Sequence, residues 1–150
     1  MANSKIYFAG PLFNYAEKAF NLEVAELLEK HGYCVFLPQR DGIIGADLAG
    51  KTEEEINKLI FTKDYDELIA SDIVFANLDG RVPDEGTCIE IGIAYAKNKV
   101  CYGIKTDTRA IIRGVDLNSM ITGCLKKIFK NTDGKKVLEE LDAYLSQNTL

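Results

Sequence analysis

The sequence predicts an α/β fold, in which a doubly wound, five-stranded parallel sheet is covered by helices as a flavodoxin-like or Rossmann-like sandwich. Two observations predict it. Short apolar runs alternate with longer helical segments along the chain, which is the pattern of successive βαβ units. The chain has 150 residues, 47% of them hydrophobic and 27% charged, which suits one globular domain with a single core. We therefore expect one domain over residues 1–150.

Each expected element follows from its local pattern. Apolar runs typical of buried strands occur in five places: "KIYFAG" at 5–10, "YCVFLP" at 33–38, "DIVFANL" at 72–78, "VCYGI" at 100–104 and a short run near "CLKKIF" at 124–129. Helical patterns occupy the segments 16–32, 52–71, 83–99 and 133–148. The longest irregular stretches are 38–51 and 105–121, and long loops in compact domains are often functional.

Composition disfavours several classes of partner. The net charge of −5, without a cluster of Lys and Arg, argues against a nucleic-acid polymer and favours a small molecule. The four cysteines are scattered and His31 is the single histidine, so we expect no disulfide framework, no metal and no cofactor. His31 precedes Gly32, which favours a place at a helix end. No apolar stretch suits a signal peptide or a membrane span, so we expect a cytoplasmic protein without a membrane partner.

In a doubly wound sheet the ligand crevice lies outside the carboxyl ends of the strands. The loops that follow Gly10, Pro38 and Leu78 should therefore border it. The first of them, "FAGPLF", lacks G-x-G-x-x-G, and Pro11 has no amide donor, so a dinucleotide or P-loop phosphate cradle is not expected. The end of the first strand also lacks the acidic residues of a receiver domain.

Two aspartates stand in unusual surroundings. Asp64 shares an i, i+4 row with Ile56, Ile60 and Leu68, so it interrupts an apolar helical stripe. Its carboxylate must either accept hydrogen bonds from backbone amides or face a ligand. Asp84 stands in the turn-rich segment "DGRVPDEGT" after the third strand, where it is either a cap or Asx-turn residue or a group of the crevice.

Glu90 is the single carboxylate in the apolar stretch from Thr87 to Lys97. Thr87 to Glu90 matches the capping box T-x-x-E, as Thr52 to Glu55 does. The alternative is chemical. A helix that is apolar nearly all round is buried, so its first-turn carboxylate faces protein or ligand, and the helix dipole favours the ionised form that a nucleophile needs.

Tyr7 alternates with Ile6 and Phe8 on the first expected strand. A strand tyrosine usually belongs to the core and finds a local partner for its hydroxyl. Toward the carboxyl end of this strand the hydroxyl would also approach the crevice, where it could orient an oxygen of Glu90. The pattern alone leaves both interpretations open.

Together these segments resemble the nucleoside 2-deoxyribosyltransferase family, which includes related 2′-deoxynucleoside 5′-phosphate N-hydrolases. Three segments carry the resemblance: "IYFAGPLF" at 6–13, "KDYDELIASDIVFANLDG" at 63–80 and "PDEGTCIEIGIAYAKNK" at 83–99. They cover most of the first hundred residues in the family's order, and in combination they are fairly specific.

The resemblance implies catalytic roles for four residues. Glu90 matches the nucleophile that attacks C1′ of 2-deoxyribose and displaces the base, and Tyr7 matches the tyrosine that positions this carboxylate. Asp64 and Asp84 match two aspartates that hold the base, one of which is suited to protonate the departing ring nitrogen. The implied substrates are a small 2′-deoxynucleoside and a free nucleobase. This chemistry follows the logic of a retaining glycosidase and needs neither metal nor histidine.

The resemblance also implies substrate-binding residues. Phe13 matches an aromatic residue near the base, and "DLNSMITG" resembles an N-x-M segment whose asparagine binds the 5′-hydroxyl in a neighbouring subunit, which would be Asn118. A homo-oligomer, at least a dimer, is then expected. The loop "PQRDGIIGADLAG" should border the base through Gln39 or Asp41. The expected set is Gly10, Phe13, Gln39, Asp41, Gly86, Asn118 and Met120.

Three functions remain open from the sequence. The first choice is transfer of 2-deoxyribose between nucleobases through a covalent glycosyl-glutamate. The second is hydrolysis of the N-glycosidic bond of 2′-deoxynucleoside 5′-monophosphates, which needs phosphate donors near Pro11 or at Thr87. The third is a non-enzymatic nucleotide-binding module, in which Glu90 only caps its helix. The end "LSQNTL" lacks the aromatic terminus that some family members place at the active site, which leaves base preference open.

Overall fold

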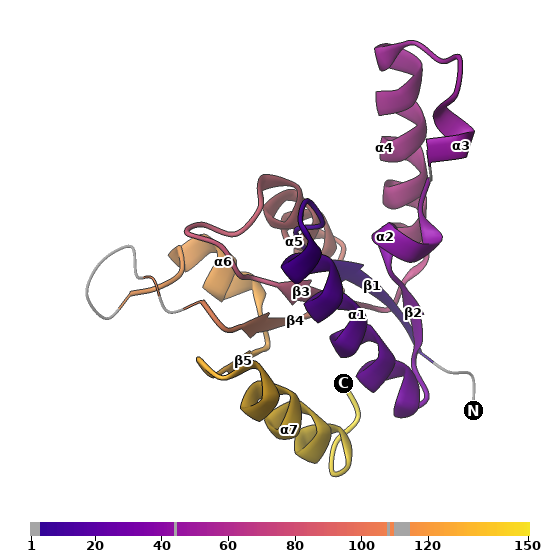
Figure 1. The fold of residues 1–150 in the computed structure, drawn as a ribbon. Coiled ribbons are helices and arrows are strands. Elements are labelled where there is room, and N and C mark those ends of the chain that lie inside the picture. The colour runs from indigo at the N-terminus through magenta and orange to yellow at the C-terminus, as the bar shows by residue number, and fades with distance from the viewer. Residues whose placement is uncertain (1–3, 44, 108, 110–114) are drawn as a thin grey trace.

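The computed structural model describes residues 4–43, 45–107, 109 and 115–150 (Figure 1). Five parallel strands form one sheet: β1 (Lys5–Ala9), β2 (Cys34–Phe36), β3 (Ile73–Asn77), β4 (Val100–Lys105) and β5 (Lys127–Lys130). Their order is β2-β1-β3-β4-β5, which confirms the predicted five-stranded parallel α/β sheet. Strand order reverses between β1 and β3, so the carboxyl ends of these two strands flank the switch point.

Helices cover both faces of the sheet (Figure 1). The long ones are α1 (Tyr15–Lys30), α4 (Glu53–Ala70), α5 (Glu85–Ala96) and α7 (Gly134–Leu145), and the short ones are α2 (Pro38–Asp41), α3 (Gly45–Leu48) and α6 (Ser119–Cys124). Residues of α1 and α7 join one core cluster, and residues of α4, α5 and α6 join the other. As predicted, His31 ends a helix, because it is the C-cap of α1. Within the described ranges, no helix has the length and apolar character needed to cross a membrane.

The central strands are buried on both faces, because alternate side chains of a strand point to opposite sides. On β1, Ile6 and Phe8 join the cluster under α1 and α7, whereas Tyr7 and Ala9 join the cluster on the α5 side. Phe75 of β3 stacks on Phe8 with ring centroids 6.2 Å apart. This alternation is what directs the Tyr7 side chain toward α5.

The structure moves several predicted boundaries. The stretch 38–51, predicted to be irregular, contains α2 and α3. The fifth strand begins at Lys127 and not at Cys124, because the segment 119–124 forms α6, which Asn118 caps through its side chain. The helix predicted from 83 begins at Glu85, and Asp84 is its N-cap.

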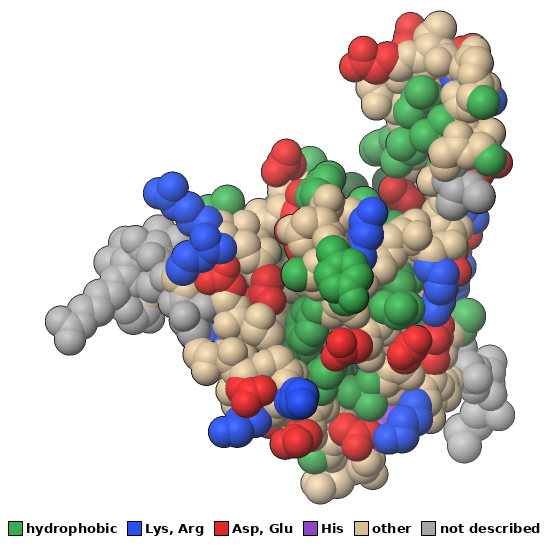
Figure 2. Space-filling model, viewed as in Figure 1, with side chains coloured by type: hydrophobic (Ala, Val, Ile, Leu, Met, Phe, Trp, Pro, Cys, Tyr) green, Lys and Arg blue, Asp and Glu red, His purple; other side chains and the backbone are tan. Residues whose placement is uncertain are grey.

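Most of α4 extends away from the rest of the molecule (Figure 1). Of its 18 residues, all of them described, only Leu68 near the C-terminal end is fully buried. Exposed apolar side chains on this helix include Leu59, Ile60 and Phe61. Figure 2 shows hydrophobic side chains gathered on the projecting part of the molecule.

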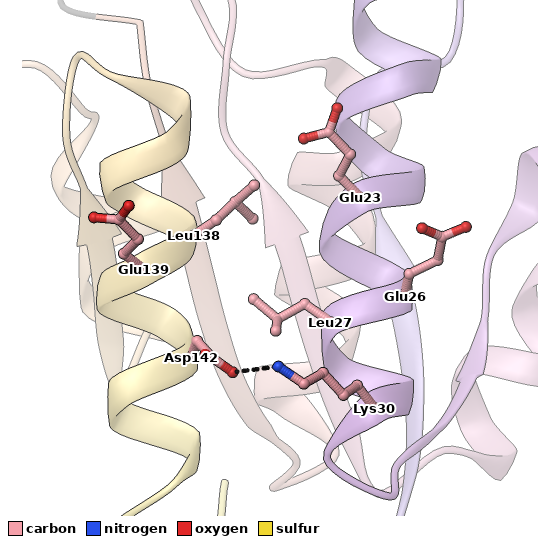
Figure 3. Close-up of a pocket in the computed structure, with 7 residues that line it drawn as sticks. All are labelled: Glu23, Glu26, Leu27, Lys30, Leu138, Glu139 and Asp142. Atoms are coloured by element: carbon pink, nitrogen blue, oxygen red, sulfur yellow. Dashed lines mark hydrogen bonds and ion pairs between the residues drawn. The ribbon is translucent and has the colours of Figure 1, made fainter.

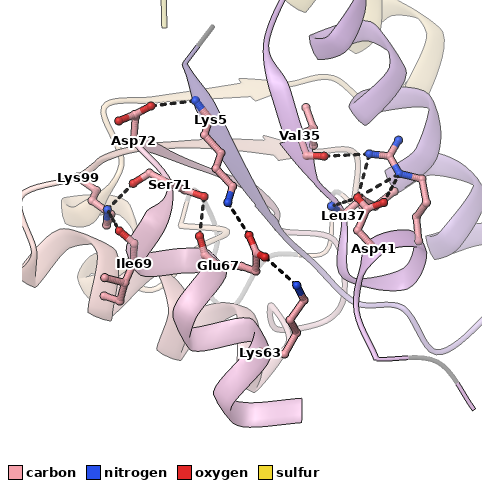
Figure 4. Close-up of polar contacts among 11 residues, drawn as sticks. Lys5, Val35, Leu37, Asp41, Lys63, Glu67, Ile69, Ser71, Asp72 and Lys99 are labelled. Carbon is pink, nitrogen blue, oxygen red and sulfur yellow. Dashed lines mark hydrogen bonds and ion pairs between the residues drawn. The ribbon is translucent and has the colours of Figure 1, made fainter. Parts of the chain in front are cut away.

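Polar contacts fasten the C-terminal end of α4 to the sheet (Figure 4). Lys5 at the start of β1 donates a hydrogen bond to Glu67 Oε2 at 2.5 Å. Lys99 donates to the carbonyl oxygen of Ile69 at 2.8 Å. Asp64 therefore lies one turn before the anchored end of the helix, where the projecting part joins the body of the molecule.

Candidate active site

A cavity of about 210 Å³ lies between α4 and α5. Each helix contributes four residues at the spacing i, i+3, i+4 and i+7, which places them on one helical face. Each face is apolar except for one carboxylate, Asp64 on α4 and Glu90 on α5. The lining residues are Phe61, Asp64, Tyr65 and Leu68 from α4, with Gly86, Ile89, Glu90 and Ile93 from α5. Two of the predicted carboxylates thus line one cavity, although they are far apart in sequence.

Tyr7 contacts Glu90 as the resemblance implied. Its hydroxyl donates a hydrogen bond to Glu90 Oε1 at 2.6 Å, and its side chain is fully buried. The ring of Tyr7 stacks on Phe36 with centroids 5.6 Å apart, which fixes the direction of the hydroxyl. Burial and the adjacent Glu90 raise the pKa of Tyr7 above its usual value, so the hydroxyl stays protonated and donates. Tyr7 is both a core residue and the partner of a carboxylate.

The ionisation of Glu90 differs from the expectation. Burial raises the pKa of Glu90 to about 7, the hydrogen bond from Tyr7 lowers it, and Asp64 and Asp84 raise it further. We expected the helix dipole to favour the ionised form of Glu90, because the pattern put this residue in the first turn of its helix. That expectation is wrong, since α5 begins at Glu85 and Glu90 lies in the second turn. Dipole stabilisation falls off within the first turn, so desolvation dominates. With this pKa the carboxyl group is partly protonated at neutral pH.

Asp64 is half-buried on the wall of the same cavity. Burial raises its pKa, with an opposing effect from Lys63. Among the described residues, no hydrogen bond to the Asp64 carboxylate is found. Of the two alternatives for this residue, hydrogen bonds from backbone amides are not observed among the described residues, and contact with a ligand stays a prediction.

Asp84 acts as the N-cap of α5. Its Oδ2 accepts from the Thr87 amide at 3.1 Å and from the Thr87 hydroxyl at 3.4 Å. The proposed capping box from Thr87 to Glu90 is therefore wrong, because Asp84 and not Thr87 begins the helix. The matching box of Thr52 and Glu55 is confirmed at the start of α4. Glu90 is consequently not a capping residue.

Both predicted glycines stand where a side chain would be crowded. A Cβ on Gly10 would lie 3.0 Å from the Asn77 Cβ at the end of β3. A Cβ on Gly86, which lines the cavity, would lie 3.0 Å from Asp84 Oδ2. Gly10 thus permits close packing under the first loop, while Gly86 leaves space beside the cap of α5.

Gln39 and Asp41 lie on α2 and do not line the cavity between α4 and α5. Gln39 Nε2 donates to the carbonyl oxygen of Lys18 at 2.8 Å. Asp41 accepts from the Leu37 amide at 2.9 Å and pairs with Arg40 at 2.9 Å. Both side chains are engaged within the chain, and their contact with a base stays a prediction.

The remaining predicted residues also lie outside this cavity. Phe13 and Met120 are exposed, with 75% and 78% of their surface accessible. Asn118 caps α6, and its Oδ1 accepts from the Met120 amide at 2.8 Å. A role for these residues in the site of a neighbouring subunit stays a prediction.

Sequence reasoning missed the apolar walls of the cavity. Phe61, Tyr65, Ile89 and Ile93 line it beside the two carboxylates. A signal was present, because Phe61 is three positions from Asp64 and Ile93 is three positions from Glu90, a spacing that places residues on one helical face. Tyr65 is four positions from Phe61, and Ile89 is four positions from Ile93, which adds them to the same faces.

A buried polar network below the first loop was also missed. Asn77 Nδ2 donates to Asn21 Oδ1 at 2.8 Å, and Asn21 Nδ2 donates to the Pro11 carbonyl at 2.7 Å. Both asparagines are almost fully buried. The network ties the loop after β1 to the end of β3, across the switch point. Asn21 precedes Val24 and Leu28 on the same face of α1, and this polar residue on an apolar stripe was the available signal.

A second hollow, of about 430 Å³, lies between α1 and α7 (Figure 3). Its charged residues are Glu23, Glu26, Lys30, Glu139 and Asp142. Lys30 and Asp142 pair across it at 3.4 Å. It contains none of the predicted site residues. Within the described part of the chain, no group of three or more His, Cys, Asp or Glu residues is arranged to hold a metal ion.

The family model for nucleoside 2-deoxyribosyltransferases matches residues 6–146. The chain belongs to this family. The match contains β1 from Ile6 onward, the other four strands, and Tyr7, Asp64, Asp84 and Glu90. A search of curated proteins finds no match.

Solved structures agree with this assignment. A conserved protein from Enterococcus faecalis V583 is 29% identical, with a TM-score of 0.75 over 95% of this chain and 99% of the other. The 2-deoxyribosyltransferase of Bacillus psychrosaccharolyticus is 25% identical, with a TM-score of 0.72 over 94% of this chain and 92% of the other. The CMP N-glycosidase BcmB of Clostridium botulinum, 23% identical with a TM-score of 0.61 over 94% and 99%, shares the fold. The family and the 2-deoxyribosyltransferase of Bacillus psychrosaccharolyticus support deoxyribosyl transfer as the type of activity.

Proposed function

We propose that the protein transfers 2-deoxyribose between nucleobases of 2′-deoxynucleosides through a covalent intermediate on Glu90. The observation that carries the proposal is the 2.6 Å hydrogen bond from Tyr7 to Glu90, in a cavity that also contains Asp64. A positioned carboxylate and a second carboxyl group are the groups that a retaining glycosidase mechanism needs.

In the first half-reaction, the ionised Glu90 carboxylate attacks C1′ and the bond from C1′ to the base breaks. Tyr7 holds Oε1, so Oε2 is the oxygen suited to attack. Asp64 is the better candidate for the acid that protonates the leaving base, because burial raises its pKa. Asp84 is placed at the cap of α5, beside Gly86, where it would hold the base.

In the second half-reaction, an acceptor base attacks the same carbon and releases Glu90. The base loses its ring proton to Asp64, which restores the acid for the next cycle. Apolar walls would limit access of water to the glycosyl-enzyme, which favours transfer over hydrolysis. Ping-pong kinetics follow from this scheme.

The charges around the crevice favour an uncharged nucleoside over a monophosphate. Helix N-termini are natural phosphate sites, but both helices that begin at the crevice are capped by their own carboxylates. Glu17 accepts from the Phe13 amide at 2.8 Å in α1, and Asp84 accepts from Thr87 in α5. Thr87 is also buried, which removes the hydroxyl donor that the hydrolase alternative needs. The guanidinium of Arg40 is engaged as well, because it pairs with Glu29 at 2.7 Å.

A homo-oligomer is part of the proposal. Leu59 and Ile60, which are exposed on α4, and the exposed Met120 are suited to contact a second copy. If Asn118 serves a neighbouring site, a dimer is the smallest active assembly. Sedimentation of an active sample as a monomer would refute this part.

Incubation with deoxyinosine and free adenine, followed by chromatography, tests the function. Deoxyadenosine is the expected product, and a deoxyribosyl adduct on Glu90 should be detectable by mass spectrometry. Release of free deoxyribose alone, or cleavage of monophosphates only, would favour the hydrolase. An absence of turnover with any of these substrates would favour a binding module.

A further inference from the structure

One wall of the cavity between α4 and α5 is aromatic. Phe61 and Tyr65 stand one turn apart on α4, with ring centroids 5.7 Å apart and ring planes inclined by only 16°. Phe61 is 64% exposed, so most of its surface remains available to another molecule. Both rings line the cavity, and their planes are nearly parallel.

The opposite wall is aliphatic, formed by Ile89 and Ile93 of α5. Carboxyl groups interrupt both walls, Asp64 beside the aromatic pair and Glu90 beside the isoleucines. A ligand that matches this slot has apolar flat faces and a polar edge. A nucleobase has that character, whereas the hydroxyl-bearing deoxyribose does not.

The volume of the cavity suits one part of a nucleoside and not the whole molecule. Its volume of about 210 Å³ is smaller than the roughly 300–1,000 Å³ of pockets that hold whole drug-sized molecules. One ring system in the slot would place its polar edge near Asp64, and its attached sugar carbon toward Glu90.

We propose that Phe61 and Tyr65 form the stacking surface for the nucleobase, so that α4 determines base preference. This inference rests on the proposed function. Stacking on an aromatic side chain tolerates different bases, because every base has a flat face. A purine has a larger flat face than a pyrimidine and makes more contact with an aromatic ring, so the wild-type protein binds purines more tightly.

Binding of free adenine and of free cytosine, measured by NMR titration, tests the inference without turnover. Phe61→Ala should raise the Kd of adenine about tenfold and that of cytosine less. Phe61→Trp should retain adenine binding. Tyr95→Ala is the matched control, because Tyr95 is an exposed aromatic residue of α5 that does not line the cavity. Melting temperatures would show that each variant folds.

The outcomes separate this inference from the proposed function. An unchanged adenine Kd in Phe61→Ala, or no binding of either base to the wild type, would overturn the stacking surface even if base exchange occurs. Loss of adenine binding in Phe61→Ala supports it even if the wild type shows no exchange, which would refute only the transfer reaction. Equal losses for both bases, with a smaller sedimentation coefficient, would assign the pair to a subunit contact and overturn the inference.

Discussion

The two faces of the sheet are covered in different ways. On one face, α1 and α7 bury a continuous apolar surface that includes Val24, Leu28, Val137 and Leu141. On the other face, the longest helix of the described chain, α4, fully buries only Leu68 and leaves apolar side chains exposed. The first face accounts for much of the core, whereas the second leaves surface free for a ligand or a second copy.

Carboxyl groups on the two faces differ as well. Asp142 pairs with Lys30 across the hollow between α1 and α7 (Figure 3). His31 and Lys30 lower the pKa of this solvated carboxyl group. In the cavity between α4 and α5, burial raises the pKa of Glu90 to about 7. The same chemical group is thus a surface ion on one face and a titrating group near neutral pH on the other, because desolvation dominates only in the cavity.

The largest effect is expected at Glu90. Glu90→Gln should reduce base exchange by roughly 10³-fold or more, because the amide cannot form the glycosyl ester. Glu85→Gln, which changes an exposed acid of the same helix, is the control. Chromatography of the exchange products measures both variants. Exchange retained by Glu90→Gln would contradict the covalent mechanism.

Glu90→Gln also tests the buried acid by a stability measurement. The pKa of Glu90 is about 7 in the folded protein and 4.5 in the unfolded chain. The contribution of this carboxyl group to the free energy of unfolding is therefore fully present below pH 4.5 and is lost as pH rises through 7. Above pH 7 the variant should therefore be more stable than the wild type, by on the order of 2 kcal/mol. Urea unfolding at several pH values measures the difference. A constant difference across pH would show that Glu90 is not buried as described.

The next largest effect separates the two faces. Leu28→Ala should lower the free energy of unfolding by about 2–5 kcal/mol, because Leu28 lies on the inner face of α1 and is fully buried. Phe61→Ala on α4 should lower it by less than about 1 kcal/mol, since most of that ring is exposed. Urea titration of both variants gives the comparison. Similar losses would mean that α4 is covered by another molecule.

Tyr7→Phe removes one hydroxyl from the site. A hydrogen bond to a charged group contributes about 1.5–3 kcal/mol, so kcat should fall about 10- to 100-fold. Since this bond lowers the pKa of Glu90, the midpoint of the rising limb of the pH profile, near 7 in the wild type, should move upward. Tyr95→Phe is the control. An unshifted midpoint would contradict the role of Tyr7.

The smallest effect concerns the anchor of α4. Glu67→Gln should cost about 1 kcal/mol of stability, because Glu67 pairs with Lys5 and Lys63 near the surface. These lysines lower the pKa of Glu67, so its contribution is present at neutral pH and is lost as pH falls. Urea unfolding should show that the difference in stability between the wild type and Glu67→Gln is smaller at about pH 3 than at pH 7. Glu54→Gln, an exposed acid at the start of α4, provides the baseline.

The strands were predictable because a parallel sheet buries both faces, and the resulting apolar runs are visible along the chain. Glu90 and Asp64 could be selected for a related reason, since each interrupts an apolar helical stripe. The start of α5 could not be placed from pattern, because Asp84 and Thr87 are both good caps and packing decides between them. The error at that cap led directly to the wrong expectation for the ionisation of Glu90.

By itself, the sequence determined the parallel α/β sheet, the family and the residue types of the site, because local periodicity and motif order are written along the chain. The tertiary structure alone decided which groups meet. It joined Tyr7 to Glu90 across 83 positions, aligned the two interrupted stripes of α4 and α5, and left Phe61 exposed beside them. Burial depends on these distant contacts, and burial is what raises the pKa of the candidate nucleophile.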